Sequence, residues 1–111
     1  MIQHFNADGE LHRDDGPAVI YDNGTLEWYQ NGKLHRDDGP AAIDPDGLCA
    51  WFQNDEWHRD DGPAIEYECG SLHWYRNGKL HRDDGPAVVW PDGTGAWYRN
   101  GVELTEEEFK K

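Results

Sequence analysis

The motif His-Arg-Asp-Asp-Gly-Pro-Ala occurs four times in this chain, always at a spacing of 23 residues. The copies begin at His12, His35, His58 and His81, with no insertion or deletion between them. A fixed period of this length is typical of repeat proteins, in which one small structural unit is stacked several times. The period therefore constrains the fold more strongly than any single residue does.

The repeat divides the chain into four full copies and two ends. The copies are residues 9–31, 32–54, 55–77 and 78–100. Residues 1–8 place Phe5 where the other copies have Trp, so we interpret them as a half repeat that forms an N-terminal cap. Residues 101–111 begin a fifth copy and then leave the motif, so we interpret them as a C-terminal cap. We expect one repeat domain over residues 1–111.

Each copy contains two segments that favour β-structure, separated by a turn. In the first copy, residues 18–21 follow proline and are β-prone, and Asn-Gly at residues 23–24 is a strong hairpin signal because both residues accept positive φ. Residues 25–30 then alternate, with Leu26 and Trp28 on one face and Glu27 and Tyr29 on the other. A second turn follows at residues 31–32, where the third copy has Asp55 in place of Gly.

These segments predict an all-β fold. We expect an antiparallel β-meander of four tandem hairpin repeats, with two strands per repeat, eight or nine strands in all, and an elongated, twisted sheet. The Trp column is expected along one face and the Tyr/Phe column along the other. A short C-terminal helical turn is also expected, because Thr105 and Glu108 have the spacing of a capping box.

The pattern resembles the MORN family of repeats, which are 23-residue β-hairpin units with a Trp-x-Asn-Gly-Lys-x-His-Gly-like core. Residues 28–35 and 74–81 match this core with one extra residue before Asn. After His, this chain has Arg-Asp-Asp-Gly-Pro instead of the short glycine step of the family. The units, and the ending Asn-Gly-Val-Glu-Leu-Thr-Glu-Glu-Glu-Phe, also resemble repeats of bacteriophage and giant-virus proteins. The resemblance implies a divergent MORN-like binding scaffold of viral origin.

The charge and the cysteines limit the partners and the compartment. The formal net charge of −13 argues against direct binding to nucleic acid or to an anionic membrane. The chain shows no signal peptide and no long apolar run, which predicts a cytoplasmic protein, in the host cytoplasm if it is viral. Cys49 and Cys69 match no zinc or redox spacing, and a disulfide between them stays possible.

The charged motif has a structural interpretation and a metal-binding one. His and Asp are metal ligands, but equivalent residues of neighbouring repeats should lie about 9–10 Å apart, too far for a shared ion. A site within one repeat remains the alternative. We favour a structural role, in which Asp caps the turn or pairs with Arg, and His bonds a backbone group or packs on an aromatic ring. The structural repeat residues are His12, His35, His58, His81, Arg13, Arg36, Arg59, Arg82, Trp28, Trp51, Trp74 and Trp97.

The Trp column also allows two interpretations. Six Trp in a chain with few aliphatic residues suggest that these rings supply core packing. The alternative is that they stack on a base or a sugar. Because no nucleophile with a base and no phosphate loop is present, we expect a protein that is not an enzyme and that needs no cofactor.

The function that we predict is binding of a protein partner, such as host machinery or a defence component. The alternatives are an acidic nucleic-acid mimic that inhibits a DNA- or RNA-binding enzyme, and a protein that sequesters a nucleotide or sugar. The protein is expected to be a monomer, or a homodimer paired through the end strands. The candidate partner-binding surface comprises Asp14, Asp15, Asp37, Asp38, Asp60, Asp61, Asp83, Asp84, Tyr21, Tyr67 and Trp90.

Overall fold

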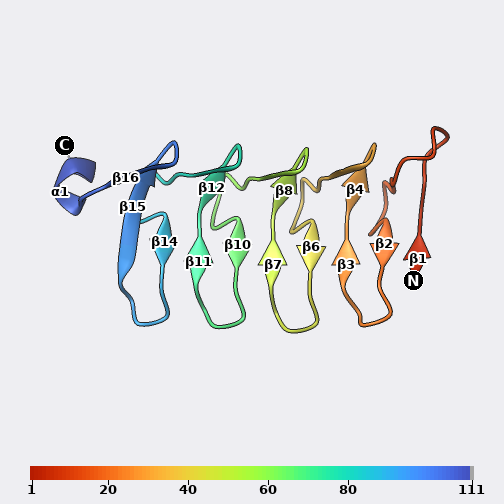
Figure 1. Cartoon of the computed structure of the whole chain (residues 1–111), viewed down its shortest axis with the longest axis horizontal. Helices are drawn as coiled ribbons and strands as arrows, with labels where there is room; N and C mark the ends of the chain where they lie inside the picture. Colours follow the sequence, from red (N-terminus) through yellow and green to blue (C-terminus); the bar gives the residue numbers. More distant parts are fainter. Residues whose placement is uncertain (111) are drawn as a thin grey trace.

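The structure is a computed structural model that describes residues 1–110, and it shows a row of β-hairpins (Figure 1). Its principal extents are 51 × 27 × 18 Å. The described residues contain one open antiparallel sheet of ten strands, in the order β1-β2-β3-β6-β7-β10-β11-β14-β15-β16. The predicted fold class, an elongated all-β meander, is confirmed. Residue 111, the last of the expected C-terminal cap, lies outside the described residues.

Two strands of every repeat lie in the main sheet. The first strands are β2 (Val19–Ile20), β6 (Ala42–Ile43), β10 (Ile65–Glu66) and β14 (Val88–Val89). The second strands are β3 (Leu26–Glu27), β7 (Cys49–Ala50), β11 (Leu72–His73) and β15 (Gly95–Arg99). Strand β1 (Ile2–Gln3) pairs with β2 and begins the sheet.

A second set of strands forms small hairpins beside the main sheet. These are β4 (Tyr29–Gln30) with β5 (Lys33–Leu34), β8 (Phe52–Gln53) with β9 (Glu56–Trp57), β12 (Tyr75–Arg76) with β13 (Lys79–Leu80), and the end of β15 with β16 (Val102–Leu104).

The expected count of two strands per repeat is therefore wrong, because three of the four long strands break at Trp. The Trp28 N–H donates to the Ala41 carbonyl across the sheet at 2.7 Å, and the chain then leaves the main sheet to pair within its own hairpin. The described residues contain sixteen strands in place of eight or nine. Only β15 runs continuously from the main sheet into the hairpin.

The two kinds of turn differ in backbone geometry. In the small hairpins, Asn31 has a φ of 50° and Gly32 a φ of 81°, as expected for an Asn-Gly turn. Asp55 also adopts positive φ, at 69°, and its side chain accepts a hydrogen bond from the Leu34 N–H at 2.7 Å. In the main sheet only Gly24 of the Asn-Gly pair has positive φ, and its N–H donates to the Tyr21 carbonyl. The prediction that both Asn23 and Gly24 have positive φ is therefore wrong. The turn is centred one residue earlier, and Gly24 forms a bulge at its end.

The core is a thin layer of small side chains in the main sheet. Ala18, Ala41, Ala64 and Ala87, the unchanging Ala column, are completely buried. The remaining buried apolar residues are Val19, Ala50, Ile65, Val88 and Ala96. The Ala41 N–H donates to the Ala50 carbonyl while its own carbonyl accepts from Trp28, so the backbone is held on both sides. This column therefore sets how closely consecutive repeats pack.

The C-terminal end carries the predicted helical turn, α1 (Glu106–Phe109). Thr105 accepts from the Glu108 N–H, and the Glu108 carboxylate accepts from the Thr105 N–H, so the predicted capping box is confirmed. Phe109 brings its ring to 6.5 Å from Trp97, and α1 covers the last hairpin. No helix within residues 1–110 has the length and apolar character of a membrane span.

The completely buried Ala column should not accept a larger residue. We expect Ala41→Leu to lower the free energy of unfolding by about 1–3 kcal/mol, because overpacking forces backbone and side-chain shifts. The matched control is Ala42→Val, at a position where the other repeats have Val19, Ile65 and Val88, and it should be neutral or stabilising. Urea denaturation of the two variants checks this, and equal losses would contradict it.

Candidate functional site

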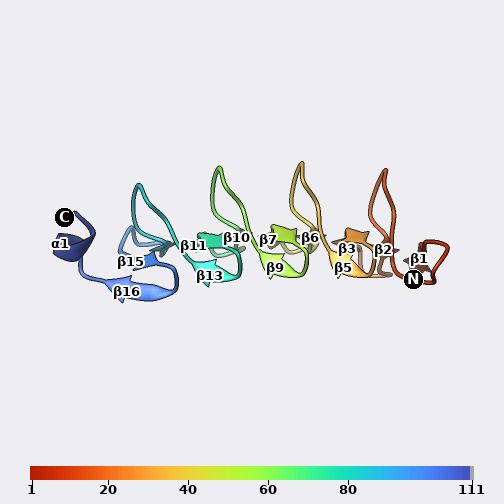
Figure 2. The ribbon, with the colours of Figure 1, turned by 90° about the horizontal axis from the view of Figure 1, so that it is seen from above.

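The four charged motifs form loops that stand out from one side of the sheet. These loops, residues 12–17, 35–40, 58–63 and 81–86, project on the side opposite the small hairpins (Figure 2). Their repetition along the sheet makes a row of four acidic loops at the edge of the molecule. We call them loops 1 to 4 in chain order.

An arginine closes each loop on itself. In loop 2 the Nε–H of Arg36 donates to Asp38 at 3.0 Å, and one terminal N–H donates to the Pro40 carbonyl at 3.1 Å. The same two contacts recur in the other three loops, at 2.8–3.2 Å. The Arg–Asp pairs predicted from the sequence are confirmed, and all four lie within a loop instead of between neighbouring repeats.

The same arginine also contacts the preceding repeat through a Trp ring. The guanidinium carbon of Arg36 lies 4.0 Å from the centroid of Trp28, and Arg59 over Trp51 and Arg82 over Trp74 lie at 3.9 Å. A cation over an indole face is stabilising, by about 0.5–2 kcal/mol. The Trp column is only half-buried, so the expectation that it supplies the core is wrong. Three of its four rings lie under arginines, and the Ala-rich sheet supplies the core instead.

The glycine of each loop lies against this guanidinium. A Cβ built on Gly39, Gly62 or Gly85 would come within 2.9 Å of the arginine carbon, which is closer than real Cβ atoms approach. These glycines have no positive φ, so backbone conformation does not require them. The close approach of the arginine explains why this column never varies.

A histidine connects each loop to the next small hairpin. In loop 3 the Nε2–H of His58 donates to Asp60 at 2.9 Å, while Nδ1 accepts from the Asn77 N–H at 3.0 Å. The same pair of contacts occurs at His12, His35 and His81. The prediction that His bonds a backbone group is confirmed. Because Nδ1 accepts, the ring hydrogen is on Nε2.

The charges of the loops are separated by depth. The Arg and His side chains are 10–31% exposed, whereas the eight aspartates are 62–87% exposed. Hydrogen bonds and charge attraction from the arginines lower the pKa of Asp15, Asp38, Asp61 and Asp84. The cations therefore organise the loops from beneath, and the surface that reaches solvent is anionic.

Neighbouring loops enclose three equivalent grooves. Groove 1 lies between loops 1 and 2, groove 2 between loops 2 and 3, and groove 3 between loops 3 and 4, with volumes of about 550, 410 and 530 Å³. Each groove is lined by four aspartates, two arginines of the loops and one Trp of the column. The structure thus brings the eight predicted aspartates together with the four predicted arginines and with Trp28, Trp51 and Trp74, whereas Trp97 lies beside α1.

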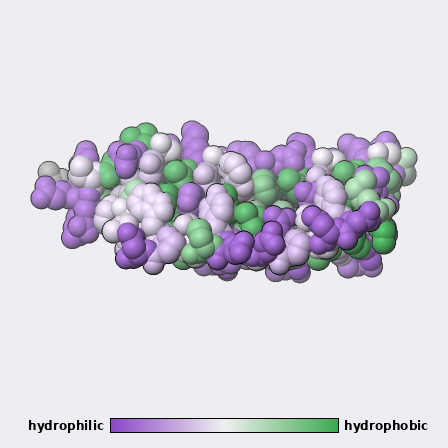
Figure 3. All heavy atoms as spheres, turned by 60° about the horizontal axis from the view of Figure 1, so that its bottom comes forward, coloured by the Kyte–Doolittle hydropathy of each residue, from purple (hydrophilic) through white to green (hydrophobic). Residues whose placement is uncertain are grey.

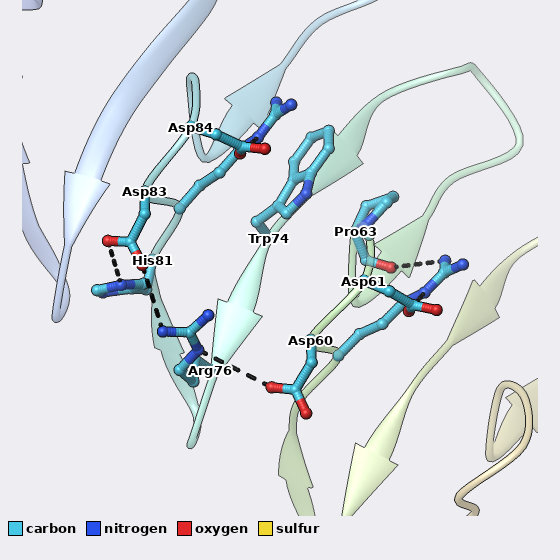
Figure 4. Close-up of a pocket in the computed structure, with 11 residues that line it drawn as sticks. Asp60, Asp61, Pro63, Trp74, Arg76, His81, Asp83 and Asp84 are labelled. Carbon is cyan, nitrogen blue, oxygen red and sulfur yellow. Dashed lines mark hydrogen bonds and ion pairs between the residues drawn. The ribbon is translucent and has the colours of Figure 1, made fainter.

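One further position distinguishes the grooves. Arg76 lies in groove 3, with Nε 4.0 Å from Asp60 and Nη1 3.4 Å from Asp83, so it bridges the two loops (Figure 4). The same position is Gln30 in groove 1 and Gln53 in groove 2. Sequence reasoning missed this column. The sequence signal that could have identified it is the change from Gln to Arg in a column that accompanies unchanging aspartates.

The other predicted surface residues lie elsewhere. The Tyr21 hydroxyl donates to Glu27 at 2.7 Å, and Tyr67 packs edge-on against His73 with the ring centres 5.0 Å apart. Glu27 pairs with Val19, and His73 with Ile65, so these contacts lie on one face of the sheet. Glu66 lies on the other face and reaches Arg59 of loop 3 at 3.5 Å. The aspartates and the Tyr21 and Tyr67 rings are therefore on opposite faces and form no single surface.

The face with Tyr67 carries an aromatic cluster in the third repeat. Trp57 packs between Phe52 and Tyr75, at centroid distances of 5.8 and 5.0 Å, and Tyr75 stacks on His73 at 6.4 Å. Burial raises the pKa of Tyr75 and lowers that of His73. Trp90, the remaining predicted residue, is 43% exposed and lines a shallow hollow beside α1.

The arrangement of the possible metal ligands and of the two cysteines within residues 1–110 bears on the remaining alternatives. No group of three or more His, Cys, Asp or Glu side chains there is arranged to hold a metal ion. Cys49 and Cys69 are both free thiols, so the possible disulfide is not formed.

On the face shown in Figure 3, hydrophilic and hydrophobic residues are mixed along the length of the molecule. The grooves remain the most regular concave feature of the surface.

The fold and the grooves define a tandem β-hairpin repeat protein with acidic loops on one side of its sheet. Comparisons of this chain with protein-family models, with curated proteins and with solved structures found no match. The MORN-like resemblance and the viral origin that it implies stay predictions.

The packing of glycine against arginine gives a test of the loop. We expect Gly62→Ala to lower the free energy of unfolding by about 1–2 kcal/mol, because the Arg59 guanidinium is held over Trp51 and must shift. Gly16→Ala is the matched control, since its nearest contact is 3.1 Å and Arg13 is not stacked on a Trp ring of residues 1–110. It should cost less. Thermal unfolding measures both, and a larger loss for Gly16→Ala would contradict this packing.

The lowered aspartate pKa values predict acid sensitivity. Because the pKa of Asp61 in the folded protein lies below its ordinary 3.8, its pairing with Arg59 stabilises the fold above about pH 4. This contribution is lost as the pH falls through the lowered value. We expect Asp61→Asn to lower the melting temperature at pH 6, and the difference from wild type to narrow towards pH 2. The control is Asp46→Asn, in a turn of the main sheet, whose carboxylate makes no ion pair within residues 1–110, and it should leave the melting temperature at pH 6 close to that of wild type.

Proposed function

We propose that this protein is a non-enzymatic scaffold whose row of acidic loops binds a protein partner with a basic surface. The single observation that carries the proposal is the separation of charge by depth in the loops. Eight aspartates are exposed, while the Arg and His side chains that pair with them are largely covered. Each motif has one more Asp than Arg, and this arrangement places all of its carboxylates on the outside, so the loops form an outward anionic row.

The stability of the fold does not account for the exposure of these carboxylates. Exposed ion pairs contribute only about 0–1 kcal/mol each, and the buried contacts of the loops are made by Arg, Gly and Trp. A fixed row of charges does favour association with an oppositely charged partner, because it raises the rate of encounter and selects the orientation. The sheet also fixes the distances between the loops, so the charges are presented in a defined geometry.

The same row supports a second candidate, the acidic nucleic-acid mimic. Its specific support is the regular placement of two aspartates per repeat along the sheet. A mimic would occupy the nucleic-acid site of its partner, so an oligonucleotide would displace it. A partner that binds without such competition would favour a general scaffold.

The test compares two variants with equal loss of charge. The loop variant carries Asp→Asn changes at Asp14, Asp37, Asp60 and Asp83, where the amide oxygen still accepts from His. The control variant carries Glu→Gln changes outside the loops, at Glu68, Glu103, Glu106 and Glu107. Immobilised wild type, loop variant and control are used to capture proteins from a bacterial lysate at about 0.1 M and 0.5 M salt.

The proposal expects a partner that wild type and control retain at low salt and that the loop variant loses. Retention by the loop variant, or equal loss by the control, would overturn it. If no partner is captured and free nucleotides or sugars quench the Trp fluorescence, the small-ligand alternative replaces it.

A further inference from the structure

The three grooves have the same walls but different occupants. In groove 3 the Arg76 guanidinium lies between the loops and reaches one aspartate on each side, Asp60 and Asp83. The chain itself therefore shows which chemical group fits between two acidic loops: a planar cation that donates to Asp83 on one side at 3.4 Å and pairs by charge with Asp60 on the other at 4.0 Å (Figure 4). Arg76 is 44% exposed, so the position is also reached from solvent.

Grooves 1 and 2 lack this cation. Gln30 donates to the Arg13 carbonyl at 3.3 Å and to Asp14 at 3.4 Å, and it makes no bond to Asp37 on the opposite loop. Within residues 1–110, the Gln53 side chain makes no hydrogen bond at all. The walls keep the same four aspartates and two loop arginines, so each of these grooves has one positive charge fewer than groove 3.

The geometry points to grooves 1 and 2 as binding sites for two arginine side chains of the partner, each placed as Arg76 is placed in groove 3. This inference rests on the proposed function and specifies its partner. Arginine fits better than lysine, because its planar fork donates in two directions at once, whereas the lysine ammonium is a compact, strongly hydrated point charge. The half-buried Trp28 and Trp51 line the same grooves and offer a surface for the stem of the side chain.

The spacing of the grooves selects the backbone of the partner. One repeat adds two strands to the main sheet, so neighbouring grooves are about 9.6 Å apart at a strand spacing of about 4.8 Å. A polyproline II segment advances about 9.3 Å in three residues, and residues three apart point to the same side. In an extended β-strand, residues on the same side are separated by about 6.6–6.8 Å or twice that. The partner segment is therefore a polyproline II stretch with arginines at positions i and i+3.

The test uses fluorescein-labelled, proline-rich peptides with blocked ends and measures anisotropy at about 0.1 M salt. The probe has two arginines three residues apart. One control peptide has them two residues apart, and a second has lysines in their place. We expect the probe to bind on the order of fivefold more tightly than either control, the effect of about 1 kcal/mol from one well-placed ion pair.

Three variants of the full chain make the assignment specific. Gln30→Arg and Gln53→Arg supply a cation of the chain itself, as in groove 3, and each should weaken binding of the probe. Arg76→Gln should open groove 3 and strengthen it. All three positions line grooves and already differ between repeats, so the folds should be retained, which circular dichroism verifies.

Equal affinity for the three peptides would overturn the inference, and so would unchanged binding by the Gln53→Arg variant. Tighter binding of a helical peptide with arginines seven residues apart would overturn the polyproline II geometry. These failures are distinct from failure of the proposed function. If the proposed function itself fails, the loop variant will still capture the lysate partner, and this result does not depend on the peptide measurements.

Discussion

The arginine of each loop makes the contacts on which the rest of the surface depends. In loop 2, Arg36 bonds Asp38 and Pro40, lies under Gly39 and stacks on Trp28 of the preceding repeat. One side chain therefore closes its own loop and ties that loop to its neighbour. Repeat proteins derive their stability from such nearest-neighbour terms. Here the term is a cation over an indole ring, added to the backbone pairing of the sheet.

At the two ends of the array, the contact between an arginine and a Trp ring is replaced by other contacts. Trp97 belongs to the last full repeat, and Phe109 of α1 lies 6.5 Å from it where an arginine loop covers the other Trp residues. Arg99 in turn stacks on Phe109 at 4.4 Å. At the other end Arg13 contacts His4 at 3.3 Å, and Phe5, which replaces Trp, is 54% exposed. The column is thus covered by Phe109 at the C-terminal end and ends in the exposed Phe5 at the N-terminal end.

The period and the turn residues were sufficient to predict the fold class from the sequence. The antiparallel meander, the Asn-Gly turns of the small hairpins and the capping box at Thr105 all follow from local rules. The break of three strands at Trp did not follow, because residues 25–30 alternate without interruption. It depends on the Trp28 N–H finding the Ala41 carbonyl of another repeat, a contact that no local pattern encodes.

The site was predicted in part for the same reason. The Arg–Asp pairing and the histidine contact were expected, since these groups lie within a few residues or in a regular register. The grouping of Tyr21 and Tyr67 with the aspartates was an assumption that sheet geometry excludes. The grooves themselves arise from the height of the loops above the sheet, which is set by how Arg13 and its equivalents fold back. The periodicity of the sequence does not predict how far the loops rise above the sheet.

Comparison of the repeats distinguishes the residues that are the same in every loop from those that differ between grooves. Arg, Gly, His and both Asp never change, and each of them makes a contact within its own loop. The column of Gln30, Gln53 and Arg76 does vary, and its members make different contacts: Gln30 bonds the Arg13 carbonyl, whereas Arg76 pairs with aspartates of two loops. A change at this position alters the charge of one groove between walls that keep the same aspartates. Two acidic grooves without an added cation therefore lie beside one that holds Arg76, so the row differs between its two ends.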